Sequence, residues 1–500
     1  MQIPPIDFTA VYPEVIVALV GLLVLAVDIF IKPQRKTSLS AIALVGLVLA
    51  FLTTMLIWDR NETAFSGMVA VDSYAQFFKL IFIFSAALTV LISPRYLSLN
   101  NISVGEYLEL VLFCTVGMMV MASANDLVTI YIGLELMAIS IYLMAGFQRD
   151  NPRSCEASMK YFLLGSFASA LLLYGMSFFY GITGTTSLQG FTLSPNSNII
   201  DSEVMTRLPL VLMTVGFAFK IAAVPFHMWT PDVYEGAPTP LTAFMSVGPK
   251  VAAFAVIMRV YMKTFGALVP DWVQMFTLLS ILTMIYGNVV AVAQKSMKRM
   301  LAYSSIAHAG YLLIGIVSAG TATEMTGGKA MSATFASESM MSVMVYLFAY
   351  MFMNLGTFAV VISLGRADNP RDSLADYAGL AKRRPLTALL MTILLLSLMG
   401  FPGTFGFIGK FYIFKAAIVT GNLTLAVVGV LMSVVAAFYY VRVVLYMYMR
   451  EPEGEVLAEG DAISSTMYAI VVTTMFTLLF GVAPGFIIDM ARYTIERMLA

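Results

Sequence analysis

The chain has 500 residues, of which 60% are hydrophobic and only 12% are charged, with a mean hydropathy of +0.87. Soluble domains carry about 25% charged residues, so this composition excludes an ordinary soluble protein. Basic and acidic residues are equal in number, which excludes the basic surface that nucleic acids require. Two cysteines and two histidines do not suffice for a disulfide framework, an iron–sulfur cluster or a His-rich metal site. We therefore expect a polytopic membrane protein that carries no cofactor and no metal of its own.

Apolar runs long enough to cross a bilayer, which takes about 20 residues, recur along the whole chain. The longest connections between them, 183–206 and 366–384, are too short for a soluble domain. Loops on one side of the predicted membrane hold about twice as many lysines and arginines as loops on the other, and positive loops stay cytoplasmic. We therefore expect both termini outside the cytoplasm. The predicted spans, about fourteen, are 11–31, 38–58, 74–93, 106–123, 125–147, 157–182, 207–229, 238–264, 272–293, 299–320, 336–365, 385–416, 421–449 and 464–488.

Basic residues inside these spans are costly, at roughly 2.5–3.5 kcal/mol each at a helix centre. Lys79, Arg259 and Arg442 stand near span ends, so we expect their side chains to reach the membrane interface. By contrast, three lysines in long apolar runs have no acid within a helical turn. They are Lys220, Lys250 and Lys410.

Partners for these three lysines must come from other helices, and Glu135 in IYIGLELMAISIYLM is the natural candidate. Static buried ion pairs that fix helix packing are one reading. One central glutamate, however, is too little acid to neutralise three lysines. We therefore favour lysines that exchange protons with their surroundings.

Two further polar sites allow a structural and a functional reading. Glu156 and Lys160 are four residues apart, which places them on one helix face as a local salt bridge or as part of a proton intake. His308 in YSSIAHAGY could relay protons or simply pack through hydrogen bonds.

Proline and glycine interrupt two spans close to a lysine. Pro225 follows Lys220 in FKIAAVPFHMW, and Pro402 precedes Lys410 in LMGFPGTFGFIGK. Unwound backbone in a bilayer is tolerated only inside protein or beside a water-filled cavity. A kink used for packing is one explanation. Two such helices, each with a lysine, instead favour an ion-translocating protein built from inverted repeats.

A faint internal repeat agrees with this interpretation. The stretch AISIYLMAG at 138–146 resembles AHAGYLLIG at 307–315. We therefore divide the chain into an N-terminal three-helix region, two antiporter-like repeats and a last span. The boundaries are 1–105, 106–265, 266–450 and 451–500.

Several stretches together resemble the antiporter-like membrane subunits of respiratory complex I, and the resemblance covers essentially the whole chain. Within that family the N-type subunits are most similar, because lysine stands at position 410, where M-type subunits are expected to have glutamate. The chain also stops at Ala500, without the long lateral helix of L-type subunits. A cation/proton antiporter subunit and a membrane-bound hydrogenase subunit share much of the pattern. The stretches are YIGLELMAISIYLMAGF, KIAAVPFHMWTPDVYEGAPTP, SVGPK, KRMLAYSSIAHAGY and GFPGTFGFIGKFYIF.

The resemblance implies an all-α membrane fold of about 14 transmembrane helices, with two inverted five-helix repeats that each contain a broken helix. It makes Glu135 the acid that pairs with Lys220, the proton-holding lysine of the first broken helix. Lys250 becomes a bridging lysine, and Lys410 the lysine of the outward half-channel. Lys160 and Glu156 match positions near the cytoplasmic intake, and His308 a polar position between the half-channels.

The implied function is proton translocation as a subunit of a translocase, NADH:quinone oxidoreductase, with electron transfer from NADH to quinone in other subunits. The resemblance places NADH, FMN, iron–sulfur clusters and quinone in the host complex and none on this chain. Expected partners are adjacent antiporter-like and small membrane subunits, lipid, water and protons, with no nucleic acid. The expected location is the bacterial inner membrane, with both termini on the periplasmic side.

Overall fold

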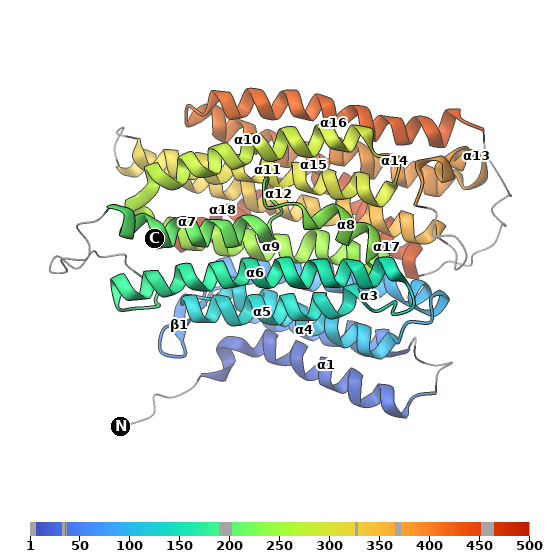
Figure 1. Ribbon diagram of the computed structural model, residues 1–500, viewed down its shortest axis with the longest axis horizontal. Helices are drawn as coiled ribbons and strands as arrows, with labels where there is room; N and C mark the ends of the chain where they lie inside the picture. Colours follow the sequence, from blue (N-terminus) through green and yellow to red (C-terminus); the bar gives the residue numbers. More distant parts are fainter. Residues whose placement is uncertain are drawn as a thin grey trace.

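Long helices packed side by side make up nearly all of the computed structural model (Figure 1). The structure describes residues 7–32, 36, 38–189, 203–325, 329–365, 372–451 and 465–499. The predicted connections 183–206 and 366–384 lie partly outside these ranges. The helices are α1 (Tyr12–Phe30), α2 (Leu39–Leu56), α3 (Ser73–Leu99), α4 (Val104–Ser123), α5 (Leu127–Ala145), α6 (Pro152–Thr183), α7 (Glu203–Lys220), α8 (Trp229–Gly236), α9 (Thr239–Lys263), α10 (Val269–Ala293), α11 (Met297–Glu324), α12 (Lys329–Leu364), α13 (Leu380–Arg383), α14 (Pro385–Met399), α15 (Phe405–Val419), α16 (Leu423–Met449), α17 (Ser465–Val482) and α18 (Gly485–Leu499).

Short elements complete the fold. The 3₁₀ helices among the described residues are Phe8–Val11, Gly266–Leu268 and Leu374–Tyr377. Strands β1 (Glu62–Ala64) and β2 (Val69–Val71) form an antiparallel hairpin before α3, which the sequence reading did not foresee.

The apolar helices match a membrane protein. Twelve helices within the described residues are long and apolar enough to span a bilayer. Two further predicted spans correspond to interrupted helices, α7 with α8 and α14 with α15, so the predicted count of about fourteen is compatible with the structure. The predicted span 464–488 needs a correction, because α17 ends at Val482 and the separate helix α18 begins at Gly485.

Burial separates central helices from peripheral ones. All of the apolar window of α9 and of α11 is buried, as is 94% of that of α12, whereas only 33% is buried in α1 and in α16. Helices α1 and α16 lie at opposite edges of the bundle in Figure 1. A helix that is apolar all round and buried belongs to the core, so α9, α11 and α12 form the centre of the molecule.

Figure 1 marks both ends of the chain on the left of the view, opposite the side that carries α13. We call the two faces the termini side and the α13 side.

Candidate functional site

The first broken helix ends at Lys220, and α8 resumes only at Trp229. Pro225 stands in the gap, where its missing N–H cannot continue a helix, and Ala222 takes a left-handed conformation with φ of 60°. Polar groups in the gap find partners inside the protein. The Val224 N–H donates to Thr283 Oγ1 at 2.9 Å, and the Trp229 indole donates to the Phe219 carbonyl at 3.1 Å. An interrupted helix is therefore sustained here without exposing its backbone to lipid.

Lys220 is 4% exposed, and its Nζ has no hydrogen-bond partner within the described chain. The ring of Tyr142 on α5 lies 5.9 Å from this nitrogen. Glu135 stands seven residues before Tyr142 and so on the same face of α5. Its Oε1 is buried and also has no partner among the described residues. No ion pair joins Glu135 to Lys220 in this structure, so the expected pairing is not a direct contact.

The second broken helix is interrupted between Met399 of α14 and Phe405 of α15. Gly400 and Gly403 on either side of Pro402 have φ of 90° and 86°, which favour glycine. Lys410 is 4% exposed and donates to the Met399 carbonyl at 2.9 Å, so it binds the C-terminal end of α14. Its Nζ also lies 4.8 Å from the centre of the Tyr311 ring on α11.

One face of helix α11 lies between Lys250 and Lys410. Lys250 of α9 donates to both the carbonyl at 2.5 Å and the hydroxyl of Ser305. His308 follows three residues later, and Tyr311, which contacts Lys410, three residues after that. Residues three apart on a helix are neighbours, so this face leads from Lys250 to Lys410.

His308 sits at the middle of this line, 1% exposed. Its Nδ1 lies 2.5 Å from the Tyr346 hydroxyl, and its Nε2 lies 3.2 Å from the Tyr440 hydroxyl. The Tyr350 ring lies 5.8 Å from Lys250 and 5.0 Å from His308. Amines, imidazole and hydroxyls can each give and accept protons, so this arrangement can pass a proton in short steps.

Glu156 and Lys160 form the salt bridge that their spacing predicts, at 2.7 Å. The structure adds Asp232 of α8, which sequence reasoning missed and which accepts from Lys160 at 2.8 Å. Arg299 of α11 binds Asp232 at 2.9 Å and Glu235 at 2.7 Å. The network joins α6, α8 and α11 around the first broken helix, and its role in proton intake stays a prediction.

Two buried ion pairs correct the expectation that Lys79 and Arg259 reach the interface. Lys79 is 1% exposed and binds Glu14 of α1 at 2.8 Å. Arg259 binds Asp72 through two contacts of 2.7 and 3.0 Å. Glu14 lies inside the first predicted span and Lys79 inside the third. An acid and a base in two separate spans are a sequence signal for a buried ion pair, and it could have predicted this contact.

Within the described ranges, no group of three or more His, Cys, Asp and Glu side chains lies close enough together to hold a metal ion.

Residues 124–436 match the family model described as NADH:quinone oxidoreductase/Mrp antiporter, TM. This segment contains both broken helices and every lysine of the site. The chain belongs to this family. It is 45% identical over 98% of its length to NADH-quinone oxidoreductase subunit N of Trichlorobacter lovleyi, covering 97% of that protein.

A second member of the family gives the same picture. Subunit N of Rhodospirillum rubrum is 41% identical, over 97% of this chain and 96% of that protein. Among solved structures, a chain of respiratory complex I from Thermus thermophilus with bound aureothin is 32% identical. It superimposes with a TM-score of 0.78 over 95% of this chain and 98% of that one. The chain is thus an N-type member of the family and a multi-pass membrane protein.

Proposed function

We propose that this chain translocates protons as a membrane subunit of NADH:quinone oxidoreductase. The observation that carries the proposal is the line of buried groups from Lys250 on α9 through His308 on α11 to Lys410 on α15, with Lys220 at the break after α7. Charged groups are costly in the interior of a membrane protein and mark ion pathways. The subunit N relatives support the choice of host complex.

Proton loading at Lys220 depends on Glu135. Approach of the carboxylate stabilises the charged lysine, and its withdrawal leaves a buried amine that favours the neutral form and releases its proton. A proton moved against ~100 mV requires about 2.3 kcal/mol. A change of about two pKa units, at about 1.4 kcal/mol each, is sufficient. Lys250, His308 and Lys410 then carry the proton onward.

We further propose that residues 106–265 and 266–450 are two copies of one repeat. Tyr142 of α5 lies beside Lys220 at 5.9 Å, and Tyr311 of α11 lies beside Lys410 at 4.8 Å. Each tyrosine is on the second helix of its half, and each lysine belongs to a broken helix. Close glycine contacts also join α4 to α5 at Gly117 and α10 to α11 at Gly287.

The α13 side is the cytoplasmic face in this proposal, because its loops carry most of the lysines and arginines. Both termini then face the periplasm. NADH, FMN, iron–sulfur clusters and quinone belong to other subunits of the complex. Neighbouring membrane subunits are the partners of this chain, in line with the complex I structure that it resembles.

A cation/proton antiporter subunit is the alternative from another class, and the N-type relatives do not favour it. It would exchange sodium for protons without NADH. A purely structural subunit would instead lose assembly, and not coupling, when its buried lysines are changed.

The test is Lys220→Met in the complex purified from native membranes and reconstituted into vesicles, with protons pumped per electron as the readout. The exposed Lys415 on α15 provides the control variant Lys415→Met. We expect the ratio to fall for Lys220→Met and to stay unchanged for the control. A full ratio in an assembled Lys220→Met complex would contradict the proposal.

A further inference from the structure

We propose that Lys250 has its own proton intake, a buried polar seam that runs between α9 and α12 from a pocket on the α13 side. The inference rests on the proposed function and adds a route separate from Lys160 and Lys220, neither of which lines the pocket or the seam.

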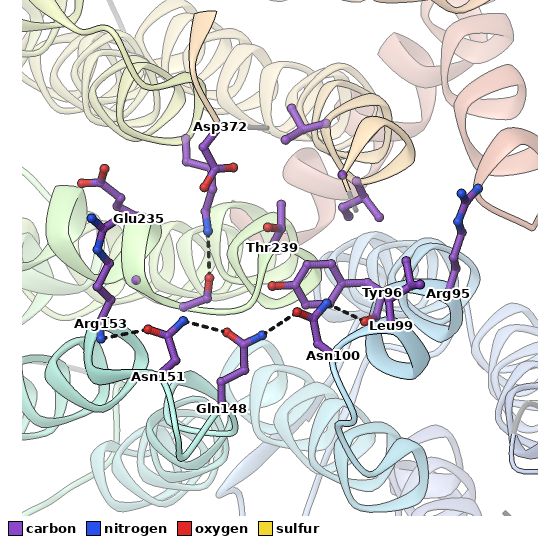
Figure 2. A pocket seen from close by; sticks show the side chains of 16 residues that line it. Arg95, Tyr96, Leu99, Asn100, Gln148, Asn151, Arg153, Glu235, Thr239 and Asp372 are labelled. Atoms are coloured by element: carbon purple, nitrogen blue, oxygen red, sulfur yellow. Dashed lines mark hydrogen bonds between the residues drawn. The ribbon is translucent and has the colours of Figure 1, made fainter. Parts of the chain in front are cut away.

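The pocket has a volume of about 190 Å³ and lies where the α13-side ends of α3, α9, α11 and α12 meet. Figure 2 shows Asn151, Gln148 and Asn100 joined by hydrogen bonds along one wall, with lengths of 3.2 and 3.0 Å. Asp372 points into the pocket from the opposite side, and Thr239 also lines it. These polar walls suit water and protons better than an apolar ligand.

Asp372 is the acid of this pocket. Its Oδ1 is buried and has no hydrogen-bond partner in the described part of the chain. Burial raises the pKa of its carboxyl above the ordinary value, although nearby Lys298 opposes the shift. Lys298 itself donates to the Ala237 carbonyl at 3.0 Å. A carboxyl with a raised pKa and a free oxygen is suited to take up a proton from the cytoplasm.

Helix α9 carries polar side chains from this pocket to Lys250. Thr239, Thr242, Ser246 and Lys250 follow one another at intervals of three or four residues, and so they share one face of the helix. All four are at most 3% exposed. The eleven steps along the helix from Thr239 to Lys250 rise about 16 Å, at about 1.5 Å each, which is about half the thickness of a bilayer core.

Helix α12 supplies the opposite wall of the seam. Asn354 donates to Ser246 Oγ at 2.5 Å, which links the two helices midway. Tyr350, one turn away on α12, lies over Lys250 at 5.8 Å, and its buried hydroxyl has no partner among the described residues. Thr357 continues the polar face of α12 toward the pocket. Both helices are otherwise apolar and buried. The polar groups of the seam are hydrogen-bonded inside the protein: Thr242 donates to the Tyr234 carbonyl of α8, and Ser246 donates to the Ala243 carbonyl. Their oxygens offer a proton successive hydrogen-bond partners across the apolar core.

Paired substitutions that remove or keep a hydroxyl test the seam in the reconstituted complex. Thr242→Val and Ser246→Ala remove it, whereas Thr242→Ser and Ser246→Thr keep it. We expect Thr242→Val and Ser246→Ala to pump protons about fivefold more slowly, because a factor of about five in rate corresponds to the free energy of one lost hydrogen bond. Thr242→Ser and Ser246→Thr should pump at a near-normal rate. Thr54→Val removes a buried hydroxyl from α2, which packs against α1, α3 and α4 and does not line the seam, and this variant should pump normally.

Normal pumping by both Thr242→Val and Ser246→Ala would contradict the proposal that the seam carries protons to Lys250. If Lys220→Met still lost pumping, the proposed function would stand without this route; if Lys220→Met also pumped normally, the proposed function itself would fail. Should Thr242→Val not assemble, Ser246→Ala, which deletes a single oxygen, decides alone. Slow pumping that the hydroxyl-keeping variants do not restore would also contradict the seam, because packing would then be the cause.

Discussion

Charged side chains inside this bundle fall into two groups. Lys79 and Arg259 each contact a carboxylate directly, at 2.8 and 2.7 Å. Lys250 and Lys410 contact hydroxyl, carbonyl and aromatic groups, and Lys220 has no hydrogen-bond partner within the described residues. A paired charge is held in place, whereas a lysine beside neutral groups can lose its proton. The second group is therefore the one that we assign to proton transfer.

Asp72→Asn tests the first group, because it leaves Arg259 buried without its partner. Burial alone would raise the pKa of Asp72, but the Arg259 guanidinium and the Ala75 N–H outweigh this and hold the pKa of the carboxyl below its ordinary value. The pair therefore stabilises the fold above the ordinary pKa, and its contribution is lost as the pH falls through the lowered value. We expect Asp72→Asn to lower the free energy of unfolding by about 3–5 kcal/mol at neutral pH, measured by thermal unfolding in detergent. The difference from the unsubstituted protein should become smaller at acid pH.

The control for this prediction is Glu338→Gln, which breaks an exposed pair with Lys415 at 3.4 Å. Such pairs contribute about 0–1 kcal/mol, so unfolding should change little. Equal effects of the two variants, or an Asp72→Asn effect that does not depend on pH, would contradict the account.

His308→Gln separates a proton relay from a packing role. Glutamine can keep hydrogen bonds to Tyr346 and Tyr440 but cannot carry a proton at neutral pH. We expect an assembled complex that pumps fewer protons per electron. Pumping equal to that of the unsubstituted complex would assign His308 to packing alone.

The broken helices are the elements that position the site. Their interruptions follow from local chemistry, since proline lacks an N–H and glycine accepts a positive φ, so the sequence around Pro225 and Pro402 was enough to predict them. What each break contacts was not predictable in this way. The hydrogen bond from Lys410 to Met399 spans eleven residues, and the one from Lys250 to Ser305 spans fifty-five. Local patterns carry no information on such contacts.

Gly400→Ala tests the geometry of the second break. Its φ of 90° would cost alanine about 1–2 kcal/mol, and the new Cβ would lie 2.9 Å from Cδ of Lys410. Gly403→Ala is the matched control, because its φ is 86° and a Cβ there meets nothing within 4 Å. We expect both variants to lower the unfolding temperature, and only Gly400→Ala to reduce protons pumped per electron. Equal pumping by the two variants would show that Lys410 tolerates displacement.

At the scale of the whole molecule, composition was enough to predict a polytopic helical membrane protein. Apolar run lengths also placed most spans. Pairing across the bundle was beyond the sequence, as Lys79 illustrates: its position near a span end favoured a side chain that reaches the interface, yet its partner Glu14 lies two helices away in the chain. Asp232 escaped notice for the same reason, because Lys160 and Arg299 approach it from separate helices. Whether a charged side chain is buried depends on which helices surround it, and the packing of those helices is not visible in the local sequence.

The central claim is that protons cross this chain along its line of buried lysines, and Lys250 is the point where the routes meet. The most direct measurement is protons pumped per electron by the reconstituted complex carrying Lys250→Met, beside Lys263→Met at the end of the same helix. We predict that Lys250→Met assembles and oxidises NADH with a lower ratio, while Lys263→Met keeps the full ratio. A full ratio with Lys250→Met would contradict the claim.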